Sequence, residues 1–310
     1  MIKTIQILLI IPFYFLFSSA AYAVFGASIS YECLGTNTYE VTLTAYQDCS
    51  DPQLTSTQNV GWVGACFPSS GSLTLTLSNR VDITPLCPSS TSNCNGGSGS
   101  DGVDKYTYRG TLTLPLGCNL ATVSWQHCCR TNSITSFNSP PAGLYVFAEI
   151  NNGAGLCNNS VRFLNEPKII GDRNDPYFYT NGAVDVDGDS LVYSLIDCQE
   201  SAGTSVDYDM GAGYSGTNPI DASPSISIDS ETGQIEFGTT PAPNQRVVIC
   251  VLVEEYRGAV RVGAVVRDLE YESQSNNMND VPLISGINVS NNYTTTATVG
   301  TSVAFFIEGT

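Results

Sequence analysis

Residues 39–45 read YEVTLTA, with apolar side chains at every second position. Successive side chains of a β-strand point to opposite faces, so this period of two predicts a strand with one buried face and one polar face. The same alternation returns in segments that begin at Ile29, Leu73, Tyr106 and Leu144. Between Ile29 and Phe163, no window of 11 residues carries a convincing helical period, so the sequence predicts an all-β fold.

Composition agrees with this fold and limits the function. Of the 310 residues, 42% are hydrophobic, which is enough to build packed cores. Acidic residues outnumber basic ones by 29 to 12, and the formal net charge is -17. A protein that follows nucleic-acid phosphates needs the opposite sign, so we expect no nucleic-acid partner.

The N-terminus has the pattern of an export signal. Lys3 precedes an apolar run from Ile7 to Phe17, and Ala21-Tyr22-Ala23 is a small-x-small cleavage pattern. This apolar run is too short for a membrane span, which needs about 20 residues. No later segment approaches that length. We therefore expect a signal peptide at 1–23, a secreted chain that begins at Val24, and no membrane span.

Cysteine usage also indicates export. All 11 cysteines follow the predicted cleavage site, and nine lie within residues 33–157, a density typical of a disulfide-stapled region in an oxidising compartment. Because 11 is odd, at least one cysteine is free, is paired between chains, or has its partner outside this sequence. The candidate disulfide residues are Cys33, Cys49, Cys66, Cys87, Cys94, Cys118, Cys128, Cys129, Cys157, Cys198 and Cys250.

Two groups of cysteines allow a closer prediction. Cys128 and Cys129 follow His127, but neighbours in a strand face opposite sides and the chain has a single histidine. Two separate disulfides are therefore favoured over a metal site. Cys198 and Cys250 form the natural pair of the later region, although their expected offset along adjacent strands leaves this bond open.

Turn clusters and the fall in cysteine density divide the chain. We expect a cysteine-rich β-sandwich at 24–164, an immunoglobulin-like or cadherin-like β-sandwich at 165–273, and at 274–310 a linker with the truncated start of a further repeat. The tandem sandwiches belong to the all-β class. The strands expected in the second unit are 176–182, 190–197, 204–209, 225–229, 234–238, 246–255 and 259–271.

Three carboxylates at alternate positions are the strongest candidate for a metal site. Asp185, Asp187 and Asp189 surround one glycine just before a predicted strand. Calcium takes six to eight oxygen ligands, so this loop predicts a calcium site, with a solvated acidic turn as the alternative. We expect the loop to lie where the last strand of its sandwich ends, so that Asp268 and Glu270 join it.

Other candidate groups have simpler explanations. Glu254 and Glu255 are neighbours whose side chains diverge on a strand, so they are expected to be exposed turn residues, with ion ligation at the junction with the first unit as the alternative. No convergent acid, base and nucleophile are visible, so no enzyme is predicted. Four aromatic residues could stack on sugars but are expected to pack in the core: Tyr145, Phe147, Tyr177 and Tyr179.

Several of these strings resemble known surface proteins. Residues 185–195 and 228–235 are similar to cadherin-like and dystroglycan-type repeats. Residues 31–49, 125–130 and 253–257 resemble the N-terminal part of large secreted Bacteroidota proteins, the PKD-like or gliding-motility-associated surface proteins exported by type IX secretion. This resemblance implies a location on the exterior of the outer membrane. Such proteins usually end in a C-terminal sorting domain, and we expect the present chain to be a fragment.

Together these features predict an exported, adhesin-type structural and interaction protein at the cell surface, rigidified by calcium. Its expected partners are a cell-surface or extracellular polymer and further repeats of the same chain. The alternative is a carbohydrate-binding module of a secreted enzyme.

Overall fold

The computed structural model describes residues 23–64, 70–84, 91–94, 96, 102–115, 120–140, 142–153, 157–167, 170–242 and 244–275, and the backbone of two short strands near the C-terminus. The predicted signal peptide, apart from its last residue, lies outside this part of the chain. So do Cys66, Cys87 and Cys118, and most of the predicted linker and repeat start.

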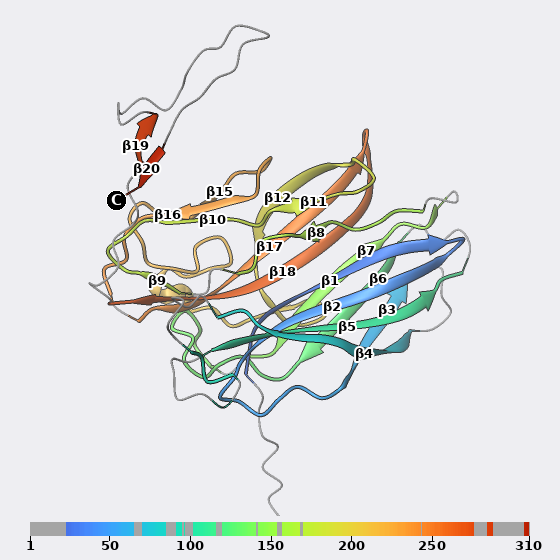
Figure 1. Cartoon of the computed structure of the whole chain (residues 1–310), viewed down its shortest axis with the longest axis horizontal. Coiled ribbons are helices and arrows are strands. Elements are labelled where there is room, and N and C mark those ends of the chain that lie inside the picture. The colour runs from blue at the N-terminus through green and yellow to red at the C-terminus, as the bar shows by residue number, and fades with distance from the viewer. Residues whose placement is uncertain are drawn as a thin grey trace, which may run out of the picture.

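Eight strands of the described chain form a closed antiparallel sheet (Figure 1). They follow the order β18-β1-β2-β5-β4-β3-β6-β7, and β7 pairs again with β18. We call this ring the closed sheet. Its strands are β1 (Val24–Gly35), β2 (Thr38–Asp48), β3 (Thr57–Gly64), β4 (Gly71–Asp82), β5 (Val103–Thr113), β6 (Ala121–His127), β7 (Leu144–Ile150) and β18 (Val260–Gln274).

The predicted alternation builds the interior of the closed sheet. Tyr39, Val41, Leu43 and Ala45 on β2 have no exposed surface, whereas the residues between them are partly exposed. Removing apolar area from water stabilises the fold by about 25 cal/mol for each Å², so the burial of this face favours the sheet. The all-β prediction is confirmed.

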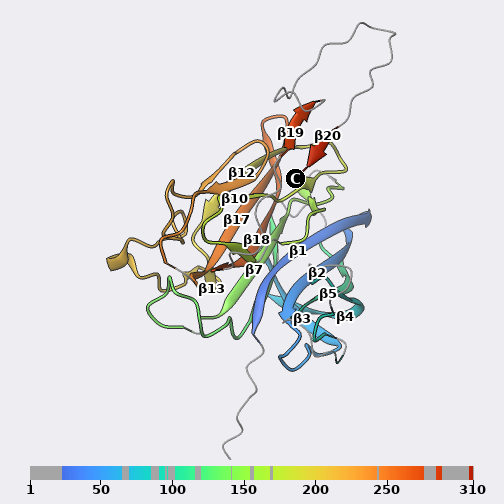
Figure 2. The same ribbon diagram turned by 60° about the vertical axis from the view of Figure 1, so that its left-hand side comes forward.

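Strand β18 belongs to both predicted units (Figure 2). Along one edge it pairs with β7 through Gly263–Val265 and with β1 through Arg267–Leu269. Along the other edge it pairs with β17 over nearly its whole length. The arrangement therefore differs from two separate sandwiches in series, because one long strand supplies hydrogen bonds to both units.

The second unit stacks a small sheet on the strands beside β18. The main hydrophobic core continues from the closed sheet into this unit. There Tyr177 and Phe237 stack with ring centroids 4.5 Å apart, and both rings contact Tyr271 of β18 edge-on. The strands of this stack are β12 (Ser190–Ile196), β17 (Arg246–Arg257), β9 (Ile170–Asp172), β10 (Tyr177–Thr180), β15 (Ser227–Ile228) and β16 (Gln234–Phe237).

Short elements complete the described chain. They are β8 (Arg162–Phe163), β11 (Ala183–Val184), β13 (Gln199–Ser201), β14 (Thr204–Ser205), the 3₁₀ helix η2 (Met210–Ala212), β19 (Ile284–Ile287) and β20 (Ile307–Gly309). Glycines with positive φ lie in the turns of the β15–β16 and β17–β18 hairpins, with φ of 69° at Gly233 and 66° at Gly258. Within the described residues, no helix is long and apolar enough to cross a membrane.

Candidate functional site

The predicted calcium loop is an ordered turn between β11 and β12. Oδ1 of Asp185 accepts hydrogen bonds from the backbone N–H groups of Asp187 and Asp189 at 2.8 and 3.0 Å. These bonds fold the loop so that ligand oxygens of the three carboxylates lie within 4.8 Å of one another. Burial raises the pKa of Asp185, and the two neighbouring carboxylates raise it further. We call these three residues the acidic loop.

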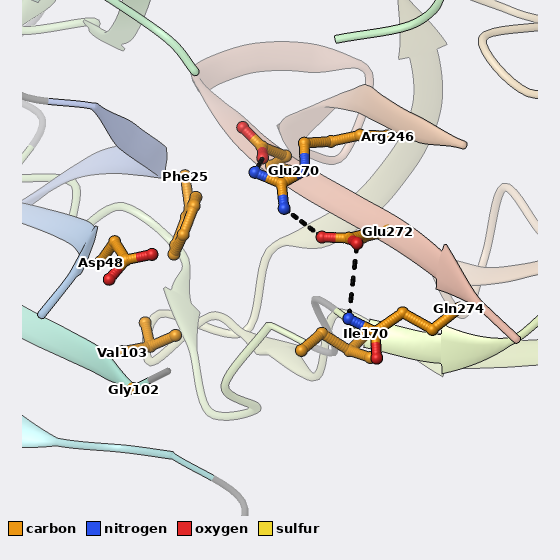
Figure 3. A pocket seen from close by; sticks show the side chains of 9 residues that line it. All are labelled: Phe25, Asp48, Gly102, Val103, Ile170, Arg246, Glu270, Glu272 and Gln274. Atoms are coloured by element: carbon orange, nitrogen blue, oxygen red, sulfur yellow. Dashed lines mark hydrogen bonds and ion pairs between the residues drawn. The ribbon is translucent and has the colours of Figure 1, made fainter. Parts of the chain in front are cut away.

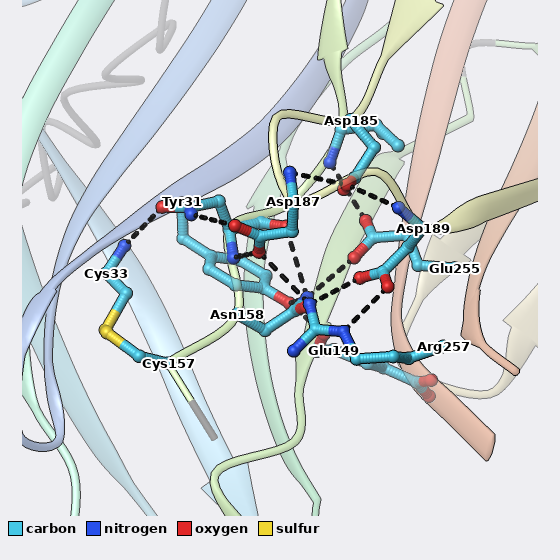
Figure 4. A network of polar contacts seen from close by, with 12 residues as sticks. Tyr31, Cys33, Glu149, Cys157, Asn158, Asp185, Asp187, Asp189, Glu255 and Arg257 are labelled. Carbon is cyan, nitrogen blue, oxygen red and sulfur yellow. Dashed lines mark hydrogen bonds and ion pairs between the residues drawn. A yellow bond between two sulfur atoms is a disulfide. The ribbon is translucent and has the colours of Figure 1, made fainter. Parts of the chain in front are cut away.

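A guanidinium group lies against the acidic loop (Figure 4). Arg257, at the end of β17, donates from Nε and Nη2 to the two carboxylate oxygens of Asp189 at 2.8 and 2.7 Å. It also contacts Asp187 at 3.3 Å and donates to Oδ1 of Asn158 at 2.8 Å. A bidentate pair of this kind is among the stronger polar contacts in proteins. Arg257 therefore offsets part of the charge that a calcium ion would otherwise neutralise.

The acidic loop is also tied to the closed sheet. Asn159 donates from its backbone N and from Nδ2 to the carboxylate of Asp187, both at 2.8 Å. Its Oδ1 accepts from the backbone N of Cys33 on β1 at 2.9 Å. Cys33 forms a disulfide with Cys157, which fixes the start of the same segment. The loop thus connects the two units through side chains as well as through the shared strand.

Glu255 lies beneath this network and has no exposed surface. One carboxylate oxygen accepts from the backbone N of Val161 at 2.9 Å, and the other accepts from Nδ2 of Asn158 at 2.8 Å. Burial raises the pKa of Glu255 to about 7, and the nearby acidic loop adds to the rise. Gly263 leaves room for this carboxylate, because a Cβ at position 263 would lie 2.4 Å from Oε2 of Glu255 and force it to move.

The prediction for the glutamate pair is therefore wrong for Glu255, which is not an exposed turn residue. The side chains do diverge, as expected: Glu254 points the other way and pairs with Arg261 at 2.7 Å. Glu255 is buried because residues 158–161 cover β17 at this point. A sequence period alone could not show that a connecting segment covers the outer face of the strand.

Asp268 and Glu270 do not join the acidic loop, which corrects the predicted ligand set. Strand β12 begins opposite Tyr256, so the loop before it lies beside the β17–β18 turn, where β18 starts. Asp268 and Glu270 lie far along β18 from that turn. The expectation placed the loop at the wrong end of β18. We call Asp268 and Glu270 the buried acidic pair.

The buried acidic pair has partners of its own. Asp268 accepts two hydrogen bonds from Arg130 at 2.7 and 2.6 Å, and both side chains are fully buried. Thr131 donates to Glu270 from 3.2 Å, and Arg246 lies 3.5 Å away. Burial raises the pKa of Glu270 to about 8, against the opposing effect of Arg246.

Four disulfides join cysteines of the described chain. Besides Cys33–Cys157, they are Cys49–Cys94, Cys128–Cys129 and Cys198–Cys250. The two adjacent cysteines are bonded to each other, which corrects the expectation of two separate disulfides. Cys198 reaches Cys250 because it lies just beyond Ile196, the cross-strand partner of Cys250, and the Cα atoms are 5.3 Å apart.

The candidate sugar-stacking aromatics pack inside the protein. Tyr145, Tyr177 and Tyr179 are buried, and Phe147 is partly buried against the main core. His127, once considered with the cysteines as a metal site, stacks on Trp125 with ring centroids 5.0 Å apart.

Sequence reasoning missed the basic and amide partners of the acidic residues. Arg130 and Arg257 end the strings 125–130 and 253–257, and Asn158 and Asn159 are neighbours, but all four are far in sequence from the carboxylates they contact and form no motif with them. Comparisons with known protein families, with characterised proteins and with solved structures found no significant match.

Proposed function

We propose that this chain is the outer part of an exported, adhesin-type protein that acts through structure and binding at a cell surface. The observation that carries the proposal is the linkage of both units into one body. Strand β18 pairs with β1, β7 and β17, and Arg130 and Asp268 form a buried ion pair beside this strand. Because the two units are joined through β18, we expect them to move together. A binding surface on the protein would then stay at a fixed distance from the point where the protein is attached to the cell.

The disulfides support the same proposal. Four are formed among the described residues, and such bonds persist in oxidising compartments outside the cytosol. This agrees with the export pattern of the first 23 residues. The negative charge of the chain favours partners that are neutral or cationic over anionic ones.

Antibody labelling and a binding assay test the proposal together. Antibodies against the chain should label intact cells of the source organism, and protease treatment of those cells should remove the label. The purified chain should then bind saturably to an immobilised extracellular polymer without altering it. Label that appears only after permeabilisation contradicts the proposal, as does turnover of a polymer. Selective binding to one class of glycan favours the carbohydrate-binding alternative.

Calcium binding at the acidic loop is the second part of the proposal. It is supported by the three converging carboxylates and by Oδ2 of Asp185, a buried atom without a hydrogen-bond partner. Calorimetric titration with calcium, repeated on Asp187→Asn, tests it. Binding at millimolar calcium that the variant abolishes supports a cation site. Absence of binding in both proteins means that Arg257 is the only counter-charge the loop needs.

A further inference from the structure

A cavity of about 150 Å³ lies at the C-terminal half of β18, where the closed sheet meets β17 and β9 (Figure 3). An engineered cavity of about this volume in another protein holds a benzene-sized ligand. The walls come from both units, because Phe25, Asp48 and Val103 belong to the closed sheet while Arg246 belongs to β17.

One wall of the cavity is apolar. Phe25 and Val103 form a small hydrophobic cluster with Tyr46 that is separate from the main core. Ile170 of β9 lines the cavity from the other side and is 45% exposed. These side chains offer a surface against which a short alkyl chain can be removed from water.

The polar groups around the cavity are mostly carboxylates. Asp48, Glu270 and Glu272 line it together with one guanidinium, that of Arg246. Arg246 is already engaged by both glutamates, at 3.5 Å from Glu270 and in a close ion pair with Glu272. The carboxylates of Asp48 and Glu272 only accept hydrogen bonds, whereas burial raises the pKa of Glu270 to about 8, so that group is mostly protonated at neutral pH. A ligand that fits this chemistry must therefore bring N–H donors and positive charge.

The aromatic ring adds to this preference. Phe25 lies between Asp48 and Glu270 in the view of the cavity. A cation near the face of an aromatic ring is attracted by its quadrupole, and the attraction is stronger where water is excluded. Glu270 is only 4% exposed, so the deep end of the cavity is shielded from solvent.

From this geometry we propose that the cavity binds a primary alkylammonium group with a chain of about four carbons, supplied by a free amine or by a lysine side chain. The chain packs on Phe25 and Val103, and the ammonium lies at the carboxylates of Asp48 and Glu272 that line the cavity. This site goes beyond the surface function proposed above and does not depend on it.

Nuclear magnetic resonance titration of the full chain with n-butylammonium tests the proposal. Saturable shifts are expected at the amides of Phe25, Val103 and Glu272. The neutral isostere n-butanol should bind about tenfold more weakly, because it lacks the charge-assisted hydrogen bonds. Equal affinity for the two ligands overturns the proposal, and so does the lack of saturable shifts up to about 10 mM ligand.

Variants locate the binding. Asp48→Asn and Glu272→Gln should each weaken n-butylammonium binding about tenfold, and Ile170→Trp should abolish it by filling the cavity. All three sites are at least partly exposed, so the variants are expected to fold, which a thermal melt checks. Glu231→Gln removes the same charge from an exposed turn and should bind as the original protein does. Equal weakening by Glu231→Gln contradicts the proposal, because the effect would then follow net charge alone.

The source of the ammonium is decided with blocked amino acids. Nα-acetyl-lysine methylamide binding to the same residues, with the norleucine analogue inactive, assigns the site to a protein lysine. If n-butylammonium binds and the lysine derivative does not, the site is assigned to a free amine. A third titration uses calcium chloride. If calcium produces the same shifts and neither amine does, the proposal is overturned in favour of a metal site.

Discussion

The acidic loop lies beside the turn where β18 begins, the buried acidic pair lies in the second half of β18, and the two groups use carboxylates in different surroundings. In the loop, the side chains of Arg257 and Asp187 are 38% and 21% exposed, while Asp189, the bidentate partner of Arg257, is 2% exposed. In the buried acidic pair, Asp268 and its partner Arg130 are both fully buried. Water therefore reaches Arg257 and Asp187 but neither Arg130 nor Asp268.

This difference decides what each group contributes. A buried charge that loses its partner has no water to replace it, so breaking a buried pair costs far more than breaking an exposed one. The buried ion pair of Arg130 and Asp268 therefore stabilises the junction of the two units. In the acidic loop, by contrast, a bound cation could replace Arg257 as the positive partner of the carboxylates. Of these two groups, the acidic loop is the better placed to exchange a metal cation with solvent.

The largest expected effect is at Arg130. Arg130→Met leaves Asp268 buried without its partner, and we expect the free energy of unfolding to fall by about 3 to 5 kcal/mol. Chemical denaturation of the oxidised protein measures this change. The double variant Arg130→Met/Asp268→Leu should be less destabilised than the single one. A loss below about 1 kcal/mol in Arg130→Met contradicts the role given to this pair.

The next largest expected effect is the dependence of the free energy of unfolding on pH, which follows from the protonation of two buried glutamates. The pKa of Glu255 rises from 4.5 to about 7 on folding, so the folded state binds the proton more tightly than the unfolded state. The stability from this group is complete below pH 4.5 and is lost as pH rises through 7, a change of about 3 kcal/mol. Glu270, with a pKa of about 8, acts in the same direction.

Glu255→Gln isolates this contribution, because glutamine resembles the protonated acid. Denaturation series between pH 4 and 8 should show a flatter pH dependence in the variant. An unchanged slope would mean that the pKa of Glu255 is the same in the folded and unfolded protein, which contradicts the rise on folding.

Removal of Arg257 should have a smaller effect on stability and a clear effect on cation binding. Arg257→Gln breaks the bidentate pair with Asp189 and should cost about 1 to 2 kcal/mol, since Arg257 is partly exposed. The three carboxylates then repel one another without compensation. We expect calcium to raise the melting temperature more in the variant than in the original protein. The opposite order would show that Arg257 and calcium do not compete.

The smallest effect is expected at an exposed ion pair. Arg162 and Glu32 contact each other with side chains that are 50% and 48% exposed. Arg162→Met should change the free energy of unfolding by less than about 1 kcal/mol. This variant is the matched control for Arg130→Met, and similar losses in both would remove the distinction between buried and exposed pairs.

The strands were predictable from the sequence because their signal is local. A period of two at Tyr39 to Ala45 already specifies which side chains are buried. Strands of the second unit, such as β12 and β17, were expected close to their observed bounds. Their alternation depends only on residues near in sequence.

The closure of the sheet and the acidic partners were not predictable, because they depend on residues far apart in the chain. Asp268 and Arg130 are separated by 138 positions, and no local pattern links them. The loop at Asp185 was placed at the wrong end of β18 for the same reason, since its position follows from the direction of β12 relative to β17.

Differential scanning calorimetry of the oxidised chain tests most directly whether β18 makes the two units one body. The account predicts a single transition in which the calorimetric enthalpy equals the van't Hoff enthalpy. Arg130→Met should lower the temperature of that transition without splitting it. Two separable transitions, with only one of them shifted by Arg130→Met, would contradict the account and show that the units unfold independently.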